Sequence, residues 1–463
     1  MDIRSSFISA QSEVPSSWGH GDDCCSWEGI TCDNGTRKIS RLDLPGIYQL
    51  IPTAVGNECW NMNLAIFSSF RELQLLNFSW NFACLQNFEG LQGLSKLKYL
   101  DLAENCLLES IPGSFGKLAS LKVINLSGNN MIGDLQDAGF ENLHNLRELH
   151  LGSNNLSGSL PASVFALPSL EYLDLSDNLF EGHIPINLSW SLRELYLSSN
   201  RLSGSLPTSL FALPFLQYLD LSHNLFEGHI PINSSWKCSS LLQTIRLSEN
   251  MLRASGYLSG WLFDGIYFSY QSHYDLQGFT FTTKGNPYKY GRNFFMSMSG
   301  IDLSENVLSG EIPPEIGNLS HIKSLNLSNN FITGPIPTTF ANMSEIESLD
   351  LSVNRLNGPI PWQLTRLSSI AVFSVAYSNL SGCLPDSGQF GSFDMDSYKG
   401  NNNLRSCTSS SGPVAPNDTV GNVSDDSDPI LYVVTAVSFI SAFWATVTFV
   451  FCHSFRQGVI LKL

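Results

Sequence analysis

The amino-acid sequence predicts an α/β solenoid, which is a stack of short coils with a parallel β-sheet along one face, followed by one C-terminal transmembrane helix. Three observations carry this prediction. A leucine-rich unit ending in asparagine recurs eleven times at nearly constant spacing, and glycine and proline recur in phase with it. One uncharged segment spans residues 430–452. A repeat period of roughly 20 to 50 residues is typical of solenoid proteins.

The repeating unit has the form L-x-x-L-x-L-x-x-N, as in residues 170–178. Within it Leu173 and Leu175 alternate with Asp174, the pattern of a strand with one buried face. No coil can bury its apolar face alone, so the leucines of neighbouring coils are expected to stack into one core. The asparagine, with two donors and one acceptor, is expected to satisfy buried backbone groups. The asparagines are 22 to 26 residues apart except across one gap, and they are Asn81, Asn105, Asn129, Asn154, Asn178, Asn200, Asn224, Asn250, Asn306, Asn330 and Asn354.

Glycine follows most of these asparagines by four residues, and proline follows them by seven. Glycine permits a backbone conformation that a turn can require, while proline fixes φ and removes a donor. Because glycine and proline keep fixed distances from the asparagines, a repeat that arises only from chance spacing of leucines is very unlikely. The pairs are Gly158 and Pro161, Gly182 and Pro185, Gly204 and Pro207, Gly310 and Pro313, Gly334 and Pro337, and Gly358 and Pro361.

The repeats, with Gly-x-Ile-Pro at 182–185, resemble the plant-specific class of leucine-rich repeats over most of residues 36–385. The resemblance implies a right-handed, curved solenoid whose parallel sheet lies on the concave face. Repeats are predicted over residues 36–250 and 299–380.

Composition argues for a binding protein. The 463 residues carry a formal net charge of -16, which disfavours nucleic acid as a partner. Only 14% of residues are charged, which suits a secreted or glycosylated surface. The sequence shows no paired acid and base, nucleophile motif or convincing metal-ligand spacing. We therefore expect no enzyme activity, no cofactor and no metal.

Twelve N-x-S/T sequons precede residue 430 and none follows it, in agreement with an extracellular portion ahead of a membrane span. The predicted glycosylation sites are Asn34, Asn77, Asn125, Asn155, Asn187, Asn233, Asn318, Asn326, Asn342, Asn379, Asn417 and Asn422.

Residues 1–35 are predicted to form a truncated N-terminal cap. Residues 1–23 show no secretory signal, which indicates an incomplete gene model or a genuine truncation. Residues 23–32, D-C-C-S-W-E-G-I-T-C, resemble the cap of plant leucine-rich-repeat receptors, with Ile30 where Val is usual. The resemblance implies a Cys25–Cys32 disulfide and leaves Cys24 without its usual upstream partner. Zinc is the alternative for these cysteines, disfavoured because no second C-x-x-C or His pair is nearby.

An aromatic insert, residues 251–298, interrupts the repeats. It resembles the island domain of plant receptor-like proteins, most clearly at residues 281–285, 288–290 and 298–304. The resemblance implies that the island folds against the concave face and shapes a ligand or co-receptor site. The alternative is that its aromatic residues only give it a small core of its own.

Residues between the strand leucines are expected to point to the concave face, where any one of them could also be a solvated surface residue. Among them are His150, Asp174, Tyr196, Asp220, His223 and Arg246. With the island, this face supplies the candidate ligand-binding residues Tyr196, Arg246, Lys284, Tyr288, Lys289 and Tyr290.

The asparagine ladder is expected to end at Ser378, where the last coil lacks asparagine. Residues 381–408 resemble the family's C-terminal cap, through Q-F-G-S-F at 389–393 and S-Y-K-G-N at 397–401. A disulfide between Cys383 and Cys407 is predicted to close it, although sequence does not fix connectivity. No partner is assigned to Cys59, Cys84, Cys106 and Cys238.

Residues 409–429 are predicted to be an acidic juxtamembrane linker, and residues 430–452 a transmembrane helix about 34 Å long. A buried core helix is the alternative, but little chain follows to bury it. Basic residues follow the span, which places the tail, residues 453–463, in the cytosol and the N-terminal part outside the plasma membrane as a single-pass type I protein. A small-residue stripe for helix pairing consists of Ser438, Ala442 and Thr446.

Caps, island, span and short tail together resemble the kinase-less receptor-like proteins of plants. The resemblance implies a cell-surface receptor for an extracellular peptide, glycan or protein ligand, which signals in defence or development through membrane co-receptor kinases. A cell-wall inhibitor of microbial glycosidases is one alternative, disfavoured by the insert and the span. A truncated, non-signalling decoy is another, favoured by the missing export signal.

Overall fold

The computed structural model describes residues 15, 17–18, 23–47, 60–136, 138–230, 242–253, 279–283, 286–290 and 299–407. The chain divides into two units, Met1–Cys407 and Thr408–Leu463, and the second lies outside the described residues. The predicted linker, span, tail and helix-pairing stripe fall in that second unit. In the described part of the chain, no helix is both long enough and apolar enough to cross a membrane.

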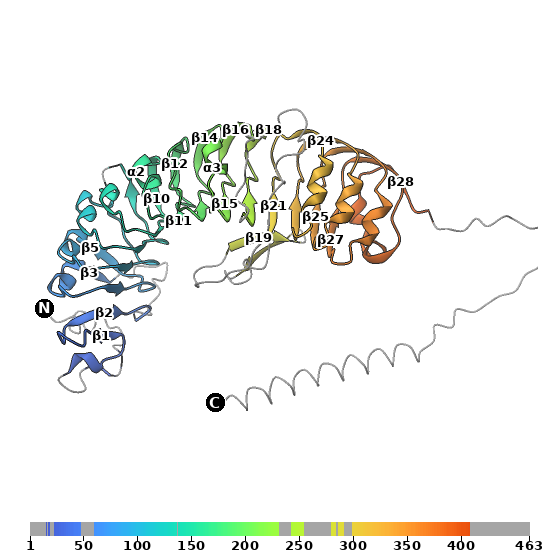
Figure 1. Cartoon of the computed structure of the whole chain (residues 1–463). Helices are drawn as coiled ribbons and strands as arrows, with labels where there is room; N and C mark the ends of the chain where they lie inside the picture. The colour runs from blue at the N-terminus through green and yellow to red at the C-terminus, as the bar shows by residue number, and fades with distance from the viewer. Residues whose placement is uncertain are drawn as a thin grey trace, which may run out of the picture. The chain divides into compact units, whose positions relative to one another are not determined.

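A 14-stranded sheet lines the inner side of the curved first unit (Figure 1). All its strands pair in parallel except β1, which is antiparallel to β2. Most strands contribute three residues, and equivalent leucines face each other in register, as Leu149, Leu173 and Leu195 do. The predicted parallel sheet is thereby confirmed. Its strands are β1 (Ile30–Cys32), β2 (Ile39–Asp43), β4 (Leu75–Asn77), β6 (Tyr99–Asp101), β7 (Val123–Asn125), β9 (Glu148–His150), β11 (Tyr172–Asp174), β13 (Glu194–Tyr196), β15 (Tyr218–Asp220), β17 (Thr244–Arg246), β21 (Gly300–Asp302), β23 (Ser324–Asn326), β25 (Ser348–Asp350) and β27 (Val372–Ser374).

Shorter sheets follow the turn of each coil, on the upper side of the unit in Figure 1. One consists of β8 (Ile132–Gly133), β10 (Asn155–Ser159), β12 (Leu179–Gly182), β14 (Arg201–Gly204), β16 (Leu225–His229) and β18 (Met251–Arg253). A second consists of β22 (Ser309–Glu311), β24 (Phe331–Gly334), β26 (Arg355–Gly358), β28 (Asn379–Cys383) and β29 (Asn403–Arg405). β3 (Asn61–Asn63) pairs with β5 (Cys84–Gln86), and in the predicted island β19 (Phe279–Thr283) pairs antiparallel with β20 (Asn286–Tyr290).

Short helices complete the coils, and proline immediately precedes most of those in the regular repeats. These prolines are N-cap residues with φ between -59° and -75°, close to the value that the proline ring fixes. The α-helices are α2 (Ala162–Phe165) and α3 (Thr208–Phe211). The 3-10 helices are η1 (Cys24–Ser26), η2 (Leu64–Ser69), η3 (Phe88–Leu91), η4 (Gly113–Lys117), η5 (Phe140–Asn142), η6 (Pro314–Asn318), η7 (Thr338–Asn342), η8 (Trp362–Arg366), η9 (Gly388–Ser392) and η10 (Met395–Tyr398).

One continuous hydrophobic core runs between the inner sheet and the helices. Leu173 and Leu175 are both fully buried, as the alternating pattern predicts. Phe180, Phe226 and Phe340 fill the outer part of the core at 0% exposure. Because each core side chain packs between adjacent coils, the stability of a coil depends on its neighbours.

The asparagine ladder performs the predicted role. Asn178 donates from Nδ2 to the carbonyls of Leu151, Leu175 and Ser176 at 3.0, 3.3 and 2.9 Å, and its Oδ1 accepts the N–H of Leu156 at 3.0 Å. Each ladder asparagine thus joins its own coil to the preceding one.

The prediction that the ladder ends at Ser378 is wrong. Asn401, inside the C-terminal cap, donates to the carbonyls of Val375 and Tyr398 and accepts the N–H of Leu380. The ladder therefore skips one coil and resumes 23 residues later. The leucine pattern hides this coil, because aromatic residues replace its leucines: Phe390, Phe393 and Tyr398 pack on Phe373.

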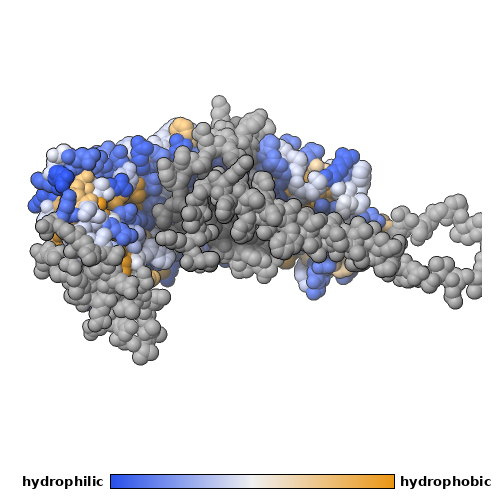
Figure 2. Space-filling model, turned by 90° about the horizontal axis from the view of Figure 1, so that it is seen from below, coloured by the Kyte–Doolittle hydropathy of each residue, from blue (hydrophilic) through white to orange (hydrophobic). Residues whose placement is uncertain are grey.

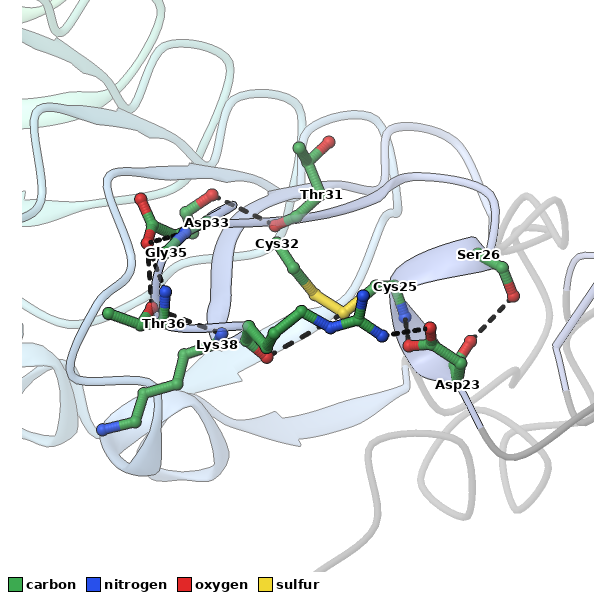
Figure 3. The surroundings of a disulfide bond; sticks show 11 residues. Asp23, Cys25, Ser26, Thr31, Cys32, Asp33, Gly35, Thr36 and Lys38 are labelled. Carbon is green, nitrogen blue, oxygen red and sulfur yellow. Dashed lines mark hydrogen bonds and ion pairs between the residues drawn. A yellow bond between two sulfur atoms is a disulfide. The ribbon is translucent and has the colours of Figure 1, made fainter.

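Disulfides close both caps. Cys25 is bonded to Cys32 (Figure 3), and Cys383 is bonded to Cys407, the pairings expected above. Cys84 is also disulfide-bonded. Within the described residues the free cysteines are Cys24 and Cys106, whereas Cys59 and Cys238 lie outside them.

Candidate functional site

The third residue of each inner strand normally serves the fold. Asp174, the third residue of β11, accepts the N–H and the hydroxyl of Ser176 at 2.9 and 2.6 Å. Such a side-chain contact mimics a backbone turn and carries the chain off the strand. The same pair of contacts recurs at Asn77, Asn125, Asp220, Asp302, Asn326 and Asp350.

Three coils in the middle of the sheet depart from this turn chemistry. The third residues of β9, β13 and β17 are His150, Tyr196 and Arg246, none of which can make the Asx contact. They alternate along the sheet with Asp174 and Asp220, which keep it. We define the inner face of β9, β11, β13, β15 and β17 as the central concave face.

Aromatic rings run across the central concave face. His150 stacks on Tyr172 with ring centroids 4.3 Å apart, and Tyr172 lies 5.4 Å from Tyr196. The hydroxyl of Tyr196 donates to Glu194 at 2.9 Å. On the next strand Tyr218 donates its hydroxyl to Gln243. Rings packed in a row present flat apolar surface at little cost in conformational entropy.

An ion pair ends this row. Arg246 Nη1 lies 3.0 Å from Asp220 Oδ2, with side-chain exposures of only 17% and 5%. Asp220 also accepts from Ser222, so its carboxylate is fixed by both contacts. A guanidinium held in this way is pre-organised to bind a carboxylate or carbonyl group of a ligand.

Burial raises the pKa of two carboxyl groups, one on the central concave face and one on β6, beyond the N-terminal edge of that face. Desolvation raises the pKa of Asp174 and that of Asp101, and in both cases the nearby His150 opposes the shift. His150 therefore lies between two acidic groups on a poorly hydrated surface. The face can bind a polar ligand through aromatic, cationic and acidic groups at neighbouring strands.

The fold brings some of the predicted ligand-binding residues together. Tyr196 and Arg246 lie 50 positions apart in the sequence but two strands apart in the sheet. Tyr288, Lys289 and Tyr290 lie on β20, whose backbone alone is described, and Lys284 lies outside the described residues.

His223 does not belong to the strand face that its predicted position implied. It follows β15 in the turn, with φ +52°, and its Nδ1 lies 2.6 Å from Glu249 Oε2. The turn position after the buried serine adopts positive φ in nearly every coil, so the side chain leaves the sheet there. Sequence reasoning also missed Tyr172 and Tyr218, although the recurring Tyr-Leu-Asp-Leu-Ser marked both.

The predicted glycosylation sites fall into two classes. Asn34, Asn155, Asn187, Asn318, Asn342 and Asn379 are exposed. Asn125 is only 6% exposed, so a glycan on its Nδ2 would require the packing around this side chain to open. Asn77 and Asn326 are half-buried. Asn233, Asn417 and Asn422 lie outside the described residues.

The described surface is mainly hydrophilic in the view of Figure 2, with hydrophobic residues in separate small groups. Among the described residues, one cluster has metal-like spacing, that of Cys24, Cys25 and Cys32. Two of these sulfurs are joined in a disulfide and are not thiolate ligands. This state of the cap does not fit the zinc alternative.

Family models agree with the repeat architecture. Models described as leucine rich repeat match residues 87–131, 129–180, 297–356, 191–213 and 215–235. A model described as leucine rich repeat N-terminal domain matches residues 1–33. The matches therefore include the cap and coils on both sides of the insert.

Curated relatives are plant receptors. Receptor-like protein 9b of Arabidopsis thaliana is 34% identical over 131 residues, which is 26% of this chain and 13% of that protein. Cuscuta receptor 1 of Solanum lycopersicum is 58% identical over 45 residues, 10% of this chain and 4% of that protein. The chain thus matches only a small part of the length of these relatives.

Among solved structures, that of PEPR1-AtPEP1 superposes with a TM-score of 0.60 at 27% identity, covering 82% of this chain and 52% of that chain. The plant peptide hormone receptor RGFR1 in complex with RGF2 has a TM-score of 0.50 at 22% identity, covering 76% and 62%, and supports the fold alone. With these repeats and this cap, the chain is a leucine-rich-repeat protein, and over the matched residues it is similar to plant receptor-like proteins.

Proposed function

We propose that the chain is a cell-surface receptor that recognises an extracellular peptide, glycan or protein on its central concave face. One observation carries the proposal. Three alternate coils lack the Asx contact that the third residues of eight other inner strands make, and they place His150, Tyr196 and Arg246 at that position. Giving up a stabilising contact at a repeated position is typical of surfaces selected for binding.

The relatives support this function. The solved structure of PEPR1 was determined with AtPEP1, and the curated matches bear the name receptor-like protein. Of the three ligand classes, a peptide or protein segment fits best. Arg and Tyr dominate protein-recognition energetics, and a row of strands spaced about 4.8 Å apart suits an extended chain.

The remaining parts of the proposal concern the membrane. Residues 430–452 would anchor the chain in the plasma membrane as a single-pass type I protein, with exposed sequons glycosylated on the outer side. Signalling would pass to a partner receptor kinase. The uncharged stretch and the acidic residues before it support this arrangement.

Substitutions on the central concave face test the binding proposal. The tagged full-length chain is panned with a random linear peptide library, and enriched peptides are synthesised for affinity measurement. Tyr196→Ala and Arg246→Gln are each expected to weaken binding by tenfold or more, about 1.4 kcal/mol, because Tyr and Arg anchors carry most of such energy.

Trp362→Ala is the matched control, because Trp362 is 63% exposed on η8, away from the inner strands. It should leave peptide affinity unchanged. Enriched peptides that bind all three variants as well as the parent chain would place the ligand elsewhere.

Substitutions in the helix-pairing stripe test the proposed association with a receptor kinase. Replacing Ser438 and Ala442 together by Leu should reduce co-precipitation of adaptor kinases by several-fold, since leucine prevents close helix approach. A Leu substitution at Phe439, which lies between them in sequence, is the control. Equal recovery of the kinase with both variants would argue against this contact.

A further inference from the structure

A row of basic side chains crosses three coils in the N-terminal half of the solenoid. Lys98, Lys122 and Arg147 immediately precede the inner strands β6, β7 and β9. The N–H of Lys122 donates to the Lys98 carbonyl, and that of Arg147 donates to the Lys122 carbonyl, both at 2.8 Å. The three residues are therefore direct neighbours on adjacent coils, which are about 4.8 Å apart. We define them as the basic row.

The two lysines of the basic row keep their positive charge without an acidic partner on a neighbouring coil. Lys98 Nζ donates to Oε1 of Gln74, a neutral group, at 2.9 Å. Among the ion pairs between described residues, none involves Lys98 or Lys122. Lys122 thus lies between two cations, one on each adjacent coil.

Arg147 is only partly neutralised. Its Nη1 lies 3.4 Å from Glu171 Oε1, while Glu171 Oε2 lies 3.4 Å from Arg193, so one carboxylate is shared by two guanidinium groups. Glu148, the next residue, lies 3.4 Å from His150 Nε2. These carboxylates leave the basic row with an excess of positive charge.

The same position is treated differently in the C-terminal coils. Lys323 immediately precedes β23 and lies 3.3 Å from Glu347, its direct neighbour on the next coil. Opposite charges on adjacent strands attract, whereas like charges repel. Three like charges in succession therefore oppose the stacking of their coils, and a local conflict of this kind is typical of a functional site.

We propose that the basic row and Tyr99 bind an anionic polysaccharide of linked uronic acids, at a second site beside the central concave face. A linear polyuronate carries one carboxylate on every sugar ring, and the basic row offers one cation on every coil. Arg147 can hold a carboxylate through two parallel hydrogen bonds. Tyr99, which follows Lys98, is 43% exposed and offers a flat apolar ring on which a sugar can stack.

An acidic peptide fits the basic row less well. An extended peptide turns every second side chain to one face, so its carboxylates recur at about 6.6 Å and fall out of step with cations about 4.8 Å apart. Polyglutamate is therefore the comparison ligand that separates the two classes of polyanion.

Binding of polygalacturonate oligomers to the tagged full-length chain tests the proposal, with biolayer interferometry as the readout. The oligomers should bind at low salt and weaken as salt is added, because exposed charges are screened. The fully methyl-esterified oligomer keeps the sugars but lacks the charges, and it should not bind. The double substitution Lys98→Gln and Lys122→Gln should weaken binding by about tenfold, since it removes two exposed cations from the row.

Lys323→Gln is the matched control, because it removes one cation from the equivalent position in a coil outside the row. It should leave the affinity unchanged, and an equal loss with this variant would show that only net charge matters. Unchanged binding by the double variant overturns the site, and tighter binding of polyglutamate than of polygalacturonate overturns the polysaccharide. Peptides selected on the central concave face should bind the double variant as well as the parent chain, so this proposal and the receptor proposal can fail separately.

Discussion

Asn178→Ala is expected to lower the free energy of unfolding by about 3 kcal/mol, which is a large loss for the truncation of one buried side chain. The substitution removes three donated hydrogen bonds and one accepted bond. The N–H of Leu156 is left buried without its acceptor, and a buried unsatisfied group costs roughly 1 to 3 kcal/mol. Denaturant unfolding of the full chain measures the change.

Two further variants separate ladder chemistry from side-chain volume. Asn178→Asp keeps the volume and the acceptor but faces three carbonyls with a carboxylate, so it should be at least as damaging as alanine. Asn357→Ala, at an exposed position on β26, should change stability by no more than about 0.5 kcal/mol. Equal effects at positions 178 and 357 would contradict the ladder argument.

The opposite substitution, which adds an asparagine to the ladder, can be made at Ser378. This residue occupies a ladder position, and its buried hydroxyl has no hydrogen-bond partner. Ser378→Asn would place a carboxamide between Val375 and Leu356, at the places where other coils use Asn. A gain of roughly 1 kcal/mol is expected.

The regular part of the fold could be predicted from sequence because its periodic residues act locally. Leu173 and Leu175 mark a buried strand face, and Gly158 adopts a positive φ of +82°, although it lies in strand β10 and not in the turn that the glycine phase predicts. Each of these residues depends only on its own coil and the next. Prediction failed at Asn401, where the period survives but aromatic packing replaces the leucines that would have revealed it.

The contacts on the central concave face, the proposed binding surface, were predicted less completely than the fold. Sequence alternation indicates that Tyr196 and Arg246 leave the core, but it does not indicate which outward residues contact each other. The Tyr172–Tyr196 packing and the Arg246–Asp220 pair join neighbouring coils, 24 and 26 residues apart. Those contacts depend on strand register and side-chain rotamers, which no single repeat encodes.

The departures from turn chemistry also connect stability with function. In coils such as that of Asp174, one side chain both ends the strand and shows a partly desolvated carboxylate to the concave face. Where His150 or Arg246 stands in place of Asp, this Asx contact is missing. The strand of that coil must then end through backbone hydrogen bonds and the bonds of the ladder asparagine. The stack can accept this loss because intact coils lie on both sides of each altered coil.

Gly317→Ala is expected to destabilise the C-terminal coils by about 2 to 4 kcal/mol, because the added Cβ would clash with the backbone of the next coil. A Cβ on Gly317, in η6, would lie 2.6 Å from Thr339 Cβ and still nearer the Thr339 carbonyl, in η7 of the next coil. Backbone atoms cannot rotate away, so the two coils must separate. Unfolding of the full chain measures the loss, and hydrogen exchange locates it.

The residues in which hydrogen exchange becomes faster distinguish a local clash between two coils from a general loss of stability. Ala341 occupies the equivalent place in η7, and Ala341→Gly should cost only about 1 kcal/mol, because glycine adds backbone freedom without a clash. Since each coil packs only on its neighbours, Gly317→Ala should speed exchange in residues 319–407 and leave β2 to β17 protected. Uniformly faster exchange would show that the stack unfolds as one cooperative unit, and stability transmitted coil by coil would then be wrong for this chain. Retained protection of β9 to β17 would mean that the central concave face keeps its geometry when the C-terminal coils open.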